Sequence, residues 1–456
     1  MAVEELPTMP TRKELAAEND RLLQECTRLR TENARLNVRL LTLQASETNT
    51  TLLSVPNSSK TDLGMHQREM CGCSLTKHSA TEEKITLFQS LFNGRPDVFA
   101  HQWKSKNGKC GYSPACKNEW VHGICGKPQM KCSRCEHANY IPYDAASIER
   151  HLRGQCVIGI YPLLLDDTCS FLAIDLDDSS WKKDINIMVQ VCRSLDVPYA
   201  VEISRSGNGA HLWFFFVEPI TASIARNFGS AILTQAMQQH ARLSFSSYDR
   251  MLPNQDTMPK GGFGNLIALP LQKEARTKGY SLFVDDHLIP YEDQWAFLSS
   301  IKKISLSMID TCLAAWRTPP LGTLQAQIEE GEKPWKRESP KLSVSDFPAV
   351  IKCTLADMLY ISTDGLSDRA QNGIKRLAAF RNPLFYQAQA MRMPIWDKPR
   401  VICCAEYRGG YLCLPRGCRE AFSTFVTEHG FDTTFHDERV AGRSVDVRFT
   451  GTLRAE

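Results

Sequence analysis

The spacing of apolar residues first indicates a coiled coil near the start of the chain. Across residues 12–44 neither Gly nor Pro occurs, and leucines recur every seventh position: Leu15, Leu22, Leu29, Leu36 and Leu43. The other core position of this heptad is mostly polar, and Asn19 and Asn33 there favour a parallel, in-register dimer. We therefore predict a homodimer through residues 12–44. The alternative is a helix packed on its own domain.

From residue 83 onward the apolar pattern alternates between the helical and the strand period. The predicted helices are residues 85–91, 147–155, 183–195, 221–240 and 292–304. The predicted strands are residues 157–165, 170–176, 198–204, 211–217, 265–271 and 281–284. We expect the first two strands to form a hairpin. Helices and strands mixed in this order, with antiparallel hairpins, are typical of an α+β sheet domain, here residues 83–316.

Two polar segments flank this domain. Residues 45–82 are rich in Ser, Thr, Asn and Lys, and residues 317–345 are rich in Pro, Glu and Lys. Both compositions predict flexible linkers. We expect residues 346–456 to form a small C-terminal α/β adaptor domain, with helices at 368–380 and 419–430 and strands at 400–406, 410–414 and 445–450.

One predicted buried strand ends in two carboxylates. Four apolar residues precede Asp175, and Leu176 separates it from Asp177. Residues two apart on a strand share a face, so the two carboxylates project together. Adjacent like charges repel, and a hard divalent cation such as Mg²⁺ relieves that repulsion. The alternative is an ordinary turn after a strand, which the Asp and Ser residues at 178–180 also favour.

A glycine loop joins the next two predicted strands. It reads Ser206-Gly207-Asn-Gly209-Ala-His211. The glycines permit a tight turn whose backbone N–H groups can face a phosphate, and His211 can donate a hydrogen bond to a triphosphate. The alternative is a plain hairpin turn beside a satisfied core histidine.

A third carboxylate is available before the strand at 265–271. Asp249 and Asp256 both precede it, and either can join Asp175 and Asp177. Three carboxylates with two divalent metals form the usual apparatus of nucleotidyl transfer.

Four cysteines between residues 110 and 140 have the spacing of a zinc ligand set. They are Cys116, Cys125, Cys132 and Cys135, and the last two form a Cys-x-x-Cys pair. Four thiolates predict a closed, tetrahedral, structural zinc knuckle, against the alternative of unrelated buried thiols. Basic residues surround the knuckle, with aromatic residues between them: Lys104, Lys106, Lys109, Lys117, Lys127, Lys131, Arg134, Trp103, Tyr112, Trp120 and Tyr140. This mixture suits a single-stranded template, or else an ordinary solvated face.

Composition narrows the class of protein only modestly. The chain has 456 residues and a formal net charge of +3, so any nucleic-acid surface must be local. Its 17 cysteines show no regular secreted framework, and no apolar stretch is long enough to span a membrane. We expect a cytoplasmic protein.

Longer phrases of the sequence resemble a known family. They lie at residues 92–100, 111–120, 247–250, 253–256 and 262–272, within a likeness that covers about residues 85–305. Together with Asp-x-Asp and Ser-Gly-x-Gly-x-His, they are similar to the primase of TOTE conflict systems, in the archaeo-eukaryotic primase superfamily. The resemblance implies a core like an RNA-recognition motif. It also implies a metal-dependent primase-polymerase that copies single-stranded DNA from nucleoside triphosphates in a defence or mobile-element conflict system.

The resemblance also implies roles for residues. Asp175, Asp177 and Asp256 match the ligands of Mg²⁺ or Mn²⁺, with Asp249 as the runner-up for the third. Ser206, Gly207, Gly209 and His211 match the nucleotide-binding motif. Many members carry a basic residue in the last strand; here Lys273, just after it, is the candidate.

The continuation of the resemblance beyond residue 305 bears on partners. The family continues into a helicase, whereas no Gly-x-x-x-x-Gly-Lys-Ser/Thr loop occurs here. We therefore expect either a separate helicase or nuclease chain as a partner, or that this chain is a truncated form of a helicase fusion. The alternative function is a non-catalytic nucleic-acid-binding dimerisation module that recruits such a chain. A nuclease using the same carboxylates is a third reading.

Overall fold

The computed structural model describes two long stretches of the chain. They are residues 75–316, apart from 106, 178, 241–242 and 244–249, and residues 342–440, apart from 396; a few isolated positions at either end are also described. The two described stretches belong to one compact unit, which begins at residue 72. Nearly all of the coiled coil, most of both linkers, Asp249 and three positions of the 445–450 strand lie outside the described residues, so these remain predictions; the described positions 446, 448 and 450 are not assigned to a strand.

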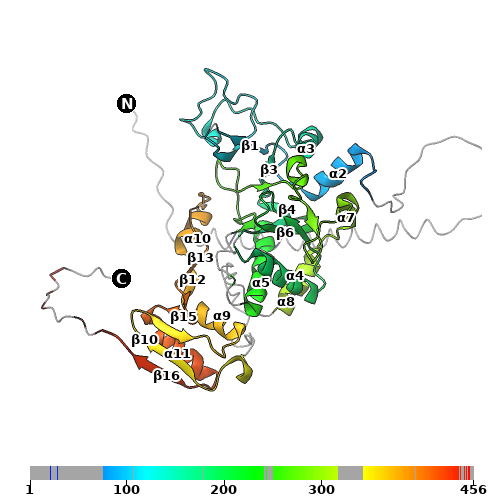
Figure 1. The fold of residues 1–456 in the computed structure, drawn as a ribbon. Helices are drawn as coiled ribbons and strands as arrows, with labels where there is room; N and C mark the ends of the chain where they lie inside the picture. Colours follow the sequence, from blue (N-terminus) through cyan, green and yellow to red (C-terminus); the bar gives the residue numbers. More distant parts are fainter. Residues whose placement is uncertain are drawn as a thin grey trace, which may run out of the picture. The chain divides into compact units, whose positions relative to one another are not determined.

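Asp175 belongs to a five-stranded antiparallel sheet with the order β7-β4-β6-β5-β9. Figure 1 labels two of its strands, β4 and β6. Its strands are β4 (Thr168–Leu176), β5 (Ala200–Ile203), β6 (Ala210–Thr221), β7 (Met251–Leu252) and β9 (Phe283–Val284). The predicted strands at 170–176, 198–204, 211–217 and 281–284 are thereby confirmed. Sheets of this kind, interleaved with helices, confirm the α+β class.

Both faces of this sheet are buried. Alternation along β4 sends Leu172 and Ile174 into one core and Phe171 and Ala173 into the other. The first core contains α4 (Trp181–Ser194), α5 (Ala222–Gln239) and α8 (Leu306–Ala315). The second contains α2 (Thr81–Leu91), α3 (Ala145–Leu152) and α7 (Gln294–Ser300). By the same alternation, Asp175 is on the face of Phe171 and Ala173, at the point where the core ends.

A second sheet has the order β2-β1-β3-β8. Its strands are β1 (Ala100–Lys104), β2 (Cys110–Pro114), β3 (Ile158–Ile160) and β8 (Ile267–Ala268). The predicted hairpin between residues 157–165 and 170–176 is wrong, because β3 pairs with β1 and β8 whereas β4 pairs with β6 and β7. A short helix, α6 (Lys273–Arg276), follows β8, and a helical turn covers Cys132–Arg134.

The C-terminal stretch forms another five-stranded sheet, with the order β14-β15-β11-β10-β16, in which only β10 and β16 pair in parallel. Its strands are β10 (Ile351–Leu355), β11 (Leu359–Ser362), β14 (Glu406–Arg408), β15 (Tyr411–Leu414) and β16 (Thr433–Asp437). Helices α9 (Asp368–Arg376) and α11 (Arg419–Glu428) pack on it. A smaller part comprises β12 (Ala379–Arg381), α10 (Pro383–Ala390) and β13 (Val401–Cys403). In the described stretches, we find no helix with the length and apolar character needed to cross a membrane.

Candidate active site

Three charged side chains form a row across neighbouring strands of the central sheet. The register pairs Asp175 of β4 with His211 of β6, and His211 with Glu202 of β5. His211 Nε2 lies 3.5 Å from Asp175 Oδ1, and His211 Nδ1 lies 2.9 Å from Glu202 Oε2. The imidazole is thus held between two carboxylates, with the more exposed one, Asp175, at the open end of the row.

Glu202 is a site residue that the sequence analysis missed. Its side chain is 1% exposed, and Oε2 also accepts a hydrogen bond from Trp213 Nε1 at 2.9 Å. Ser281 Oγ donates to Oε1 at 3.3 Å. The available signal was a single Glu in an otherwise apolar strand, at the distance from a turn that places it opposite His211.

The two carboxylates favour the protonated form of His211. Burial alone lowers the pKa of an imidazole, but the charge of Glu202, its hydrogen bond and the charge of Asp175 outweigh burial and raise the pKa of His211 above its ordinary value. Because a carboxylate only accepts hydrogen bonds, His211 Nδ1 donates to Glu202. A protonated His211 also has an N–H at Nε2, directed toward the Asp175 side.

Asp177 lies one residue beyond the end of β4 and is half exposed. Arg250 forms an ion pair with Asp177, and the Arg250 carbonyl accepts the Asp175 backbone N–H at 3.0 Å. Gly209 packs closely here: a Cβ at position 209 would lie 2.5 Å from the Leu176 carbonyl oxygen and 3.1 Å from Asp177 Cα. The structure therefore brings the glycine loop against the carboxylate pair.

The glycine loop spans residues 204–209 between β5 and β6. Gly207 has φ 78°, a conformation that favours glycine. Two of its N–H groups are engaged within the loop, since Gly207 N donates to the Ser204 carbonyl at 2.9 Å and Asn208 N donates to Ser206 Oγ at 3.2 Å. These two groups therefore do not face outward toward a phosphate, contrary to the expectation for such a loop.

Asp256 has different surroundings from the other two carboxylates. Its Oδ1 lies 3.3 Å from Arg226 Nε and 3.3 Å from Arg400 Nη2, and both arginines are buried. Gln389 Nε2 donates to Oδ2 at 2.9 Å. Arg226 belongs to α5, whereas Gln389 and Arg400 come from the C-terminal stretch, so Asp256 joins distant parts of the chain.

The described residues do not assemble the expected three-carboxylate cluster. Among them, no three His, Cys, Asp or Glu side chains lie close enough together to hold a metal ion. The candidate Lys273 lies on the first turn of α6, and its side chain is exposed. Its Cβ lies beside Gly154, which is not one of the candidate site residues. The contacts at this end of β4 are therefore those of Asp175 with His211 and of Gly209 with Asp177.

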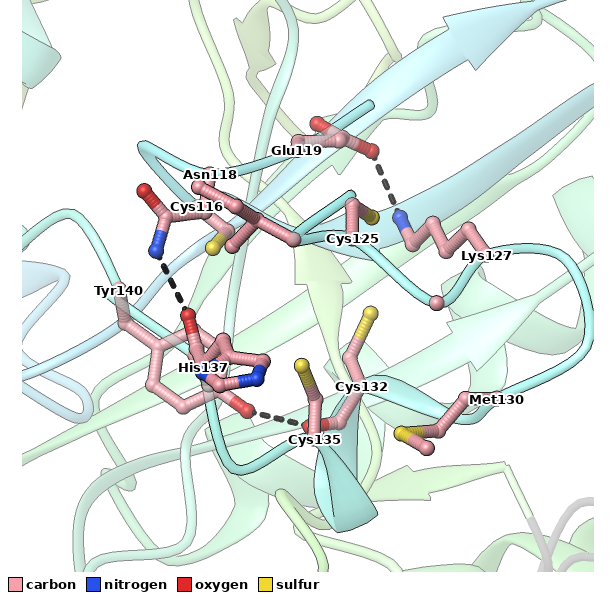
Figure 2. Close-up of a pocket in the computed structure, with 13 residues that line it drawn as sticks. Cys116, Asn118, Glu119, Cys125, Lys127, Met130, Cys132, Cys135, His137 and Tyr140 are labelled. Carbon is pink, nitrogen blue, oxygen red and sulfur yellow. Dashed lines mark hydrogen bonds and ion pairs between the residues drawn. The ribbon is translucent and has the colours of Figure 1, made fainter. Parts of the chain in front are cut away.

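The four cysteines of the expected knuckle line one small cavity of about 20 Å³. Figure 2 shows the thiols of Cys116, Cys125, Cys132 and Cys135 directed toward a common space. Tyr140 donates a hydrogen bond to the Cys132 carbonyl at 2.8 Å, and the Asn139 N–H donates to Cys116 Sγ at 3.3 Å. The thiols are gathered, although they are not at the mutual distances of metal ligands.

Comparisons with known proteins identify the family. The family model for the TOTE conflict system archaeo-eukaryotic primase domain matches residues 83–312, just over half of the chain. No curated protein matches. Solved structures that match include the polymerase domain of Mycobacterium tuberculosis ligase D in complex with DNA, at 14% identity and a TM-score of 0.26, over 52% of this chain and 89% of that chain. The chain belongs to the family of TOTE conflict system archaeo-eukaryotic primase domains.

Proposed function

We propose that the chain is a metal-dependent primase-polymerase that transfers nucleotides from nucleoside triphosphates onto a strand copied from a single-stranded DNA template. Family membership supports the reaction class. One observation supports particular residues as the site of this reaction. Asp175 of β4 and His211 of β6 lie opposite each other, and Gly209 packs against Asp177. Asp175 and His211 are thus in contact at the end of β4, and Asp177 follows directly after that strand.

The donor set at this end of β4 fits a hard divalent cation. Asp175 and Asp177 offer carboxylate oxygens, are 34% and 52% exposed, and have one residue between them. Asp177 is paired with Arg250, whose guanidinium would have to move away for a metal to bind there. Mg²⁺ commonly takes one or two carboxylates and completes its shell with substrate phosphates and water. Bound there, Mg²⁺ or Mn²⁺ supplies charge neutralisation for the triphosphate and activation of the attacking hydroxyl.

The surroundings of Asp256 favour ion pairs with arginine over metal binding. Its Oδ1 faces two guanidinium groups, and Oδ2 accepts from Gln389. We therefore propose that Asp256 acts as a positioning residue in this chain, and that the metal ligands are Asp175 and Asp177. The alternative third ligand is Asp249.

The remaining residues bind the nucleotide in this proposal. His211 donates from Nε2 to the triphosphate, and buried Glu202 orients the imidazole and favours its protonated form. The glycine loop, with Ser206, Gly207 and Gly209, forms the surface beside the carboxylates. Lys273 is the candidate for a longer-range contact with phosphate. Catalysis then consists mainly of positioning and charge neutralisation.

We also propose a structural zinc ion among the four thiols. Cysteine sulfur is a ligand type that zinc prefers, and the four residues line one cavity of about 20 Å³. Zinc content of the purified chain, measured by mass spectrometry, tests this. About one equivalent is expected, falling in a Cys132→Ser/Cys135→Ser variant and unchanged in Cys192→Ser, whose thiol is buried elsewhere.

The same proposal includes dimerisation through residues 12–44, a cytoplasmic location, a separate helicase or nuclease partner and a role in conflict systems. It also includes the division into domains at residues 83–316 and 346–456. Sedimentation of the full chain against a form lacking residues 1–71 tests the dimer.

Metal-dependent nucleotide binding separates catalysis from the alternative binding module. Calorimetric titration with a non-hydrolysable nucleoside triphosphate should show binding that requires Mg²⁺ or Mn²⁺. An Asp175→Asn/Asp177→Asn variant should lose that metal dependence. Equal binding by the variant, or no binding by the wild type, would favour the non-catalytic module.

A further inference from the structure

A groove beside the cysteine cavity has the features of a binding site for a linear polymer. It has a volume of about 870 Å³ and is bounded by β1, β2, the cysteine-rich segment and the loop at residues 262–264. Two tryptophans line it: Trp103, 42% exposed, and Trp120, 67% exposed. We call it the tryptophan groove.

Trp103 has room for its ring because the paired residue on the next strand has no side chain. Its partner in the β1–β2 register is Gly111. A Cβ at Gly111 would lie 2.4 Å from the Trp103 ring, so the indole lies across the glycine. The arrangement leaves a ring face along the groove rather than folded into the core.

The backbone of Trp120 has an unfavourable conformation, and its side chain is not buried in a way that would offset the cost. Its φ is 60°, which costs a bulky residue roughly 1 kcal/mol or more. The side chain stays largely in solvent, and Lys127 Nζ lies 5.7 Å from the centre of its ring. Strain at an exposed aromatic residue is typical of a binding surface rather than of a fold determinant.

The charge along the groove is positive. Lys104 and Lys131 line it and are exposed. Lys127 is neutralised by Glu119 at 2.6 Å, so these two lysines supply the surplus. Aromatic faces with lysines between them match a strand whose bases are unpaired and whose phosphates run alongside. In a duplex the base faces are already stacked, so the same surface would have less to bind.

The groove also adjoins the candidate active site. Tyr112 lines the groove, and burial raises the pKa of its hydroxyl. The charge of Arg205, which directly precedes Ser206 in the glycine loop, opposes that rise. The start of the glycine loop therefore lies near Tyr112, one of the residues that line the groove.

We propose that the tryptophan groove binds single-stranded nucleic acid, with bases stacked on Trp103 and Trp120 and phosphates against Lys104 and Lys131. This deepens the proposed function, on which its role as the template site rests. Binding of the strand itself does not require catalysis.

Fluorescence anisotropy of a labelled oligo-dT with the full-length chain tests the groove. Trp103→Ala and Trp120→Ala should each weaken binding about tenfold, within the range known for loss of one stacked base. Phe380→Ala, which removes an equally exposed aromatic residue elsewhere, should leave binding unchanged. Lys131→Ala should reduce the slope of log affinity against log salt by about 1.

Trp120→Gly separates binding from folding. Glycine accepts φ 60° without strain, so this variant should unfold at a urea concentration at least as high as the wild type and yet bind oligo-dT about tenfold more weakly. Unchanged affinity in both Trp120 variants would overturn the proposal. So would equal affinity for a blunt duplex, or tight capture of a protein partner at the same tryptophans.

The carboxylate variant distinguishes failure of the groove from failure of the proposed function. Asp175→Asn/Asp177→Asn should bind oligo-dT with wild-type affinity. If the wild type fails to synthesise but binds through the tryptophans, the groove stands and the catalytic proposal falls. If it synthesises but the tryptophan variants bind normally, the groove proposal falls.

Discussion

Glu202 and His211 lie opposite each other on β5 and β6, with His211 Nδ1 2.9 Å from the Glu202 carboxylate. This contact fixes which nitrogen of the imidazole faces the exposed side. Trp213 Nε1 also donates to Glu202 Oε2, so a second hydrogen bond helps to hold the carboxylate in this position. Glu202 is therefore a positioning residue that sets both the direction and the charge of His211.

Glu202→Gln should lower the pKa of His211. The neutral amide removes the largest contribution that raises this pKa, while burial, which lowers it, remains. Because the pKa of His211 is raised in the wild type, activity that needs the imidazolium should fall at a higher pH in the wild type than in the variant. An NMR titration of the imidazole measures the shift directly.

The matched control for this titration is Glu218→Gln, which removes an exposed carboxylate from the same β6 strand. Its His211 titration should match the wild type. Identical midpoints in Glu202→Gln and the wild type would show that Glu202 does not hold the proton.

Gly209→Ala should impair synthesis without unfolding the chain. The added Cβ would lie 2.5 Å from the Leu176 carbonyl oxygen, so the end of β4 and with it Asp177 must move. A displacement near 1 Å at reacting groups can cost about 100-fold. We expect kcat/KM to fall at least tenfold. Gly417→Ala adds the same methyl group in open space and should have no effect; equal activity of both variants would contradict the close approach.

Asp256→Ala should destabilise the fold by about 3–5 kcal/mol, because it leaves the buried Arg226 and Arg400 without their shared carboxylate. Urea unfolding in EDTA measures this without any metal contribution. Asp397→Ala, at an exposed aspartate, should change stability little. If Asp256→Ala matches the wild type in EDTA but loses metal binding, Asp256 is a ligand and our assignment is wrong.

Acid should weaken the fold through His151. This buried residue accepts the Ile158 N–H at Nδ1 and donates from Nε2 to the Pro270 carbonyl, and burial lowers its pKa to about 4. Between the ordinary histidine pKa and about 4, the unfolded chain binds a proton that the folded chain does not. Stability from this group is therefore complete above the ordinary value and decreases as the pH falls.

Urea unfolding at pH 7 and pH 5 measures the His151 contribution. Since one pKa unit corresponds to about 1.4 kcal/mol, the wild type should lose about 2 kcal/mol from this group over that interval. His151→Gln should be less stable at pH 7 but lose correspondingly less on acidification. Parallel losses in both proteins would show that His151 does not resist protonation.

The sequence predicted what depends on local pattern. The strands that carry Asp175 and His211, the helices around them and the gathering of four cysteines follow from apolar period and spacing. The hairpin at residues 157–176 was mistaken, because β3 finds its partners in β1 and β8, far away in the chain. Local alternation specifies that a strand exists but not which strand it joins.

The part of the site that escaped prediction depends on distant contacts. Gln389 and Arg400, which contact Asp256, are 133 and 144 positions away from it in the chain. The sequence near Asp256 gives no indication of these contacts. Glu202 escaped because a lone Glu in an apolar strand becomes meaningful only once the β5–β6 register puts His211 opposite it.

The most direct measurement is synthesis on single-stranded DNA by the purified chain, with Mg²⁺ or Mn²⁺ and each nucleotide set in turn, with and without a primer. The account predicts a product with at least one nucleotide set, and its loss in an Asp175→Ala/Asp177→Ala variant that unfolds at the same urea concentration as the wild type. Product that persists in that variant, or its absence from the wild type under every condition, would contradict a nucleotidyl-transfer site at the end of β4.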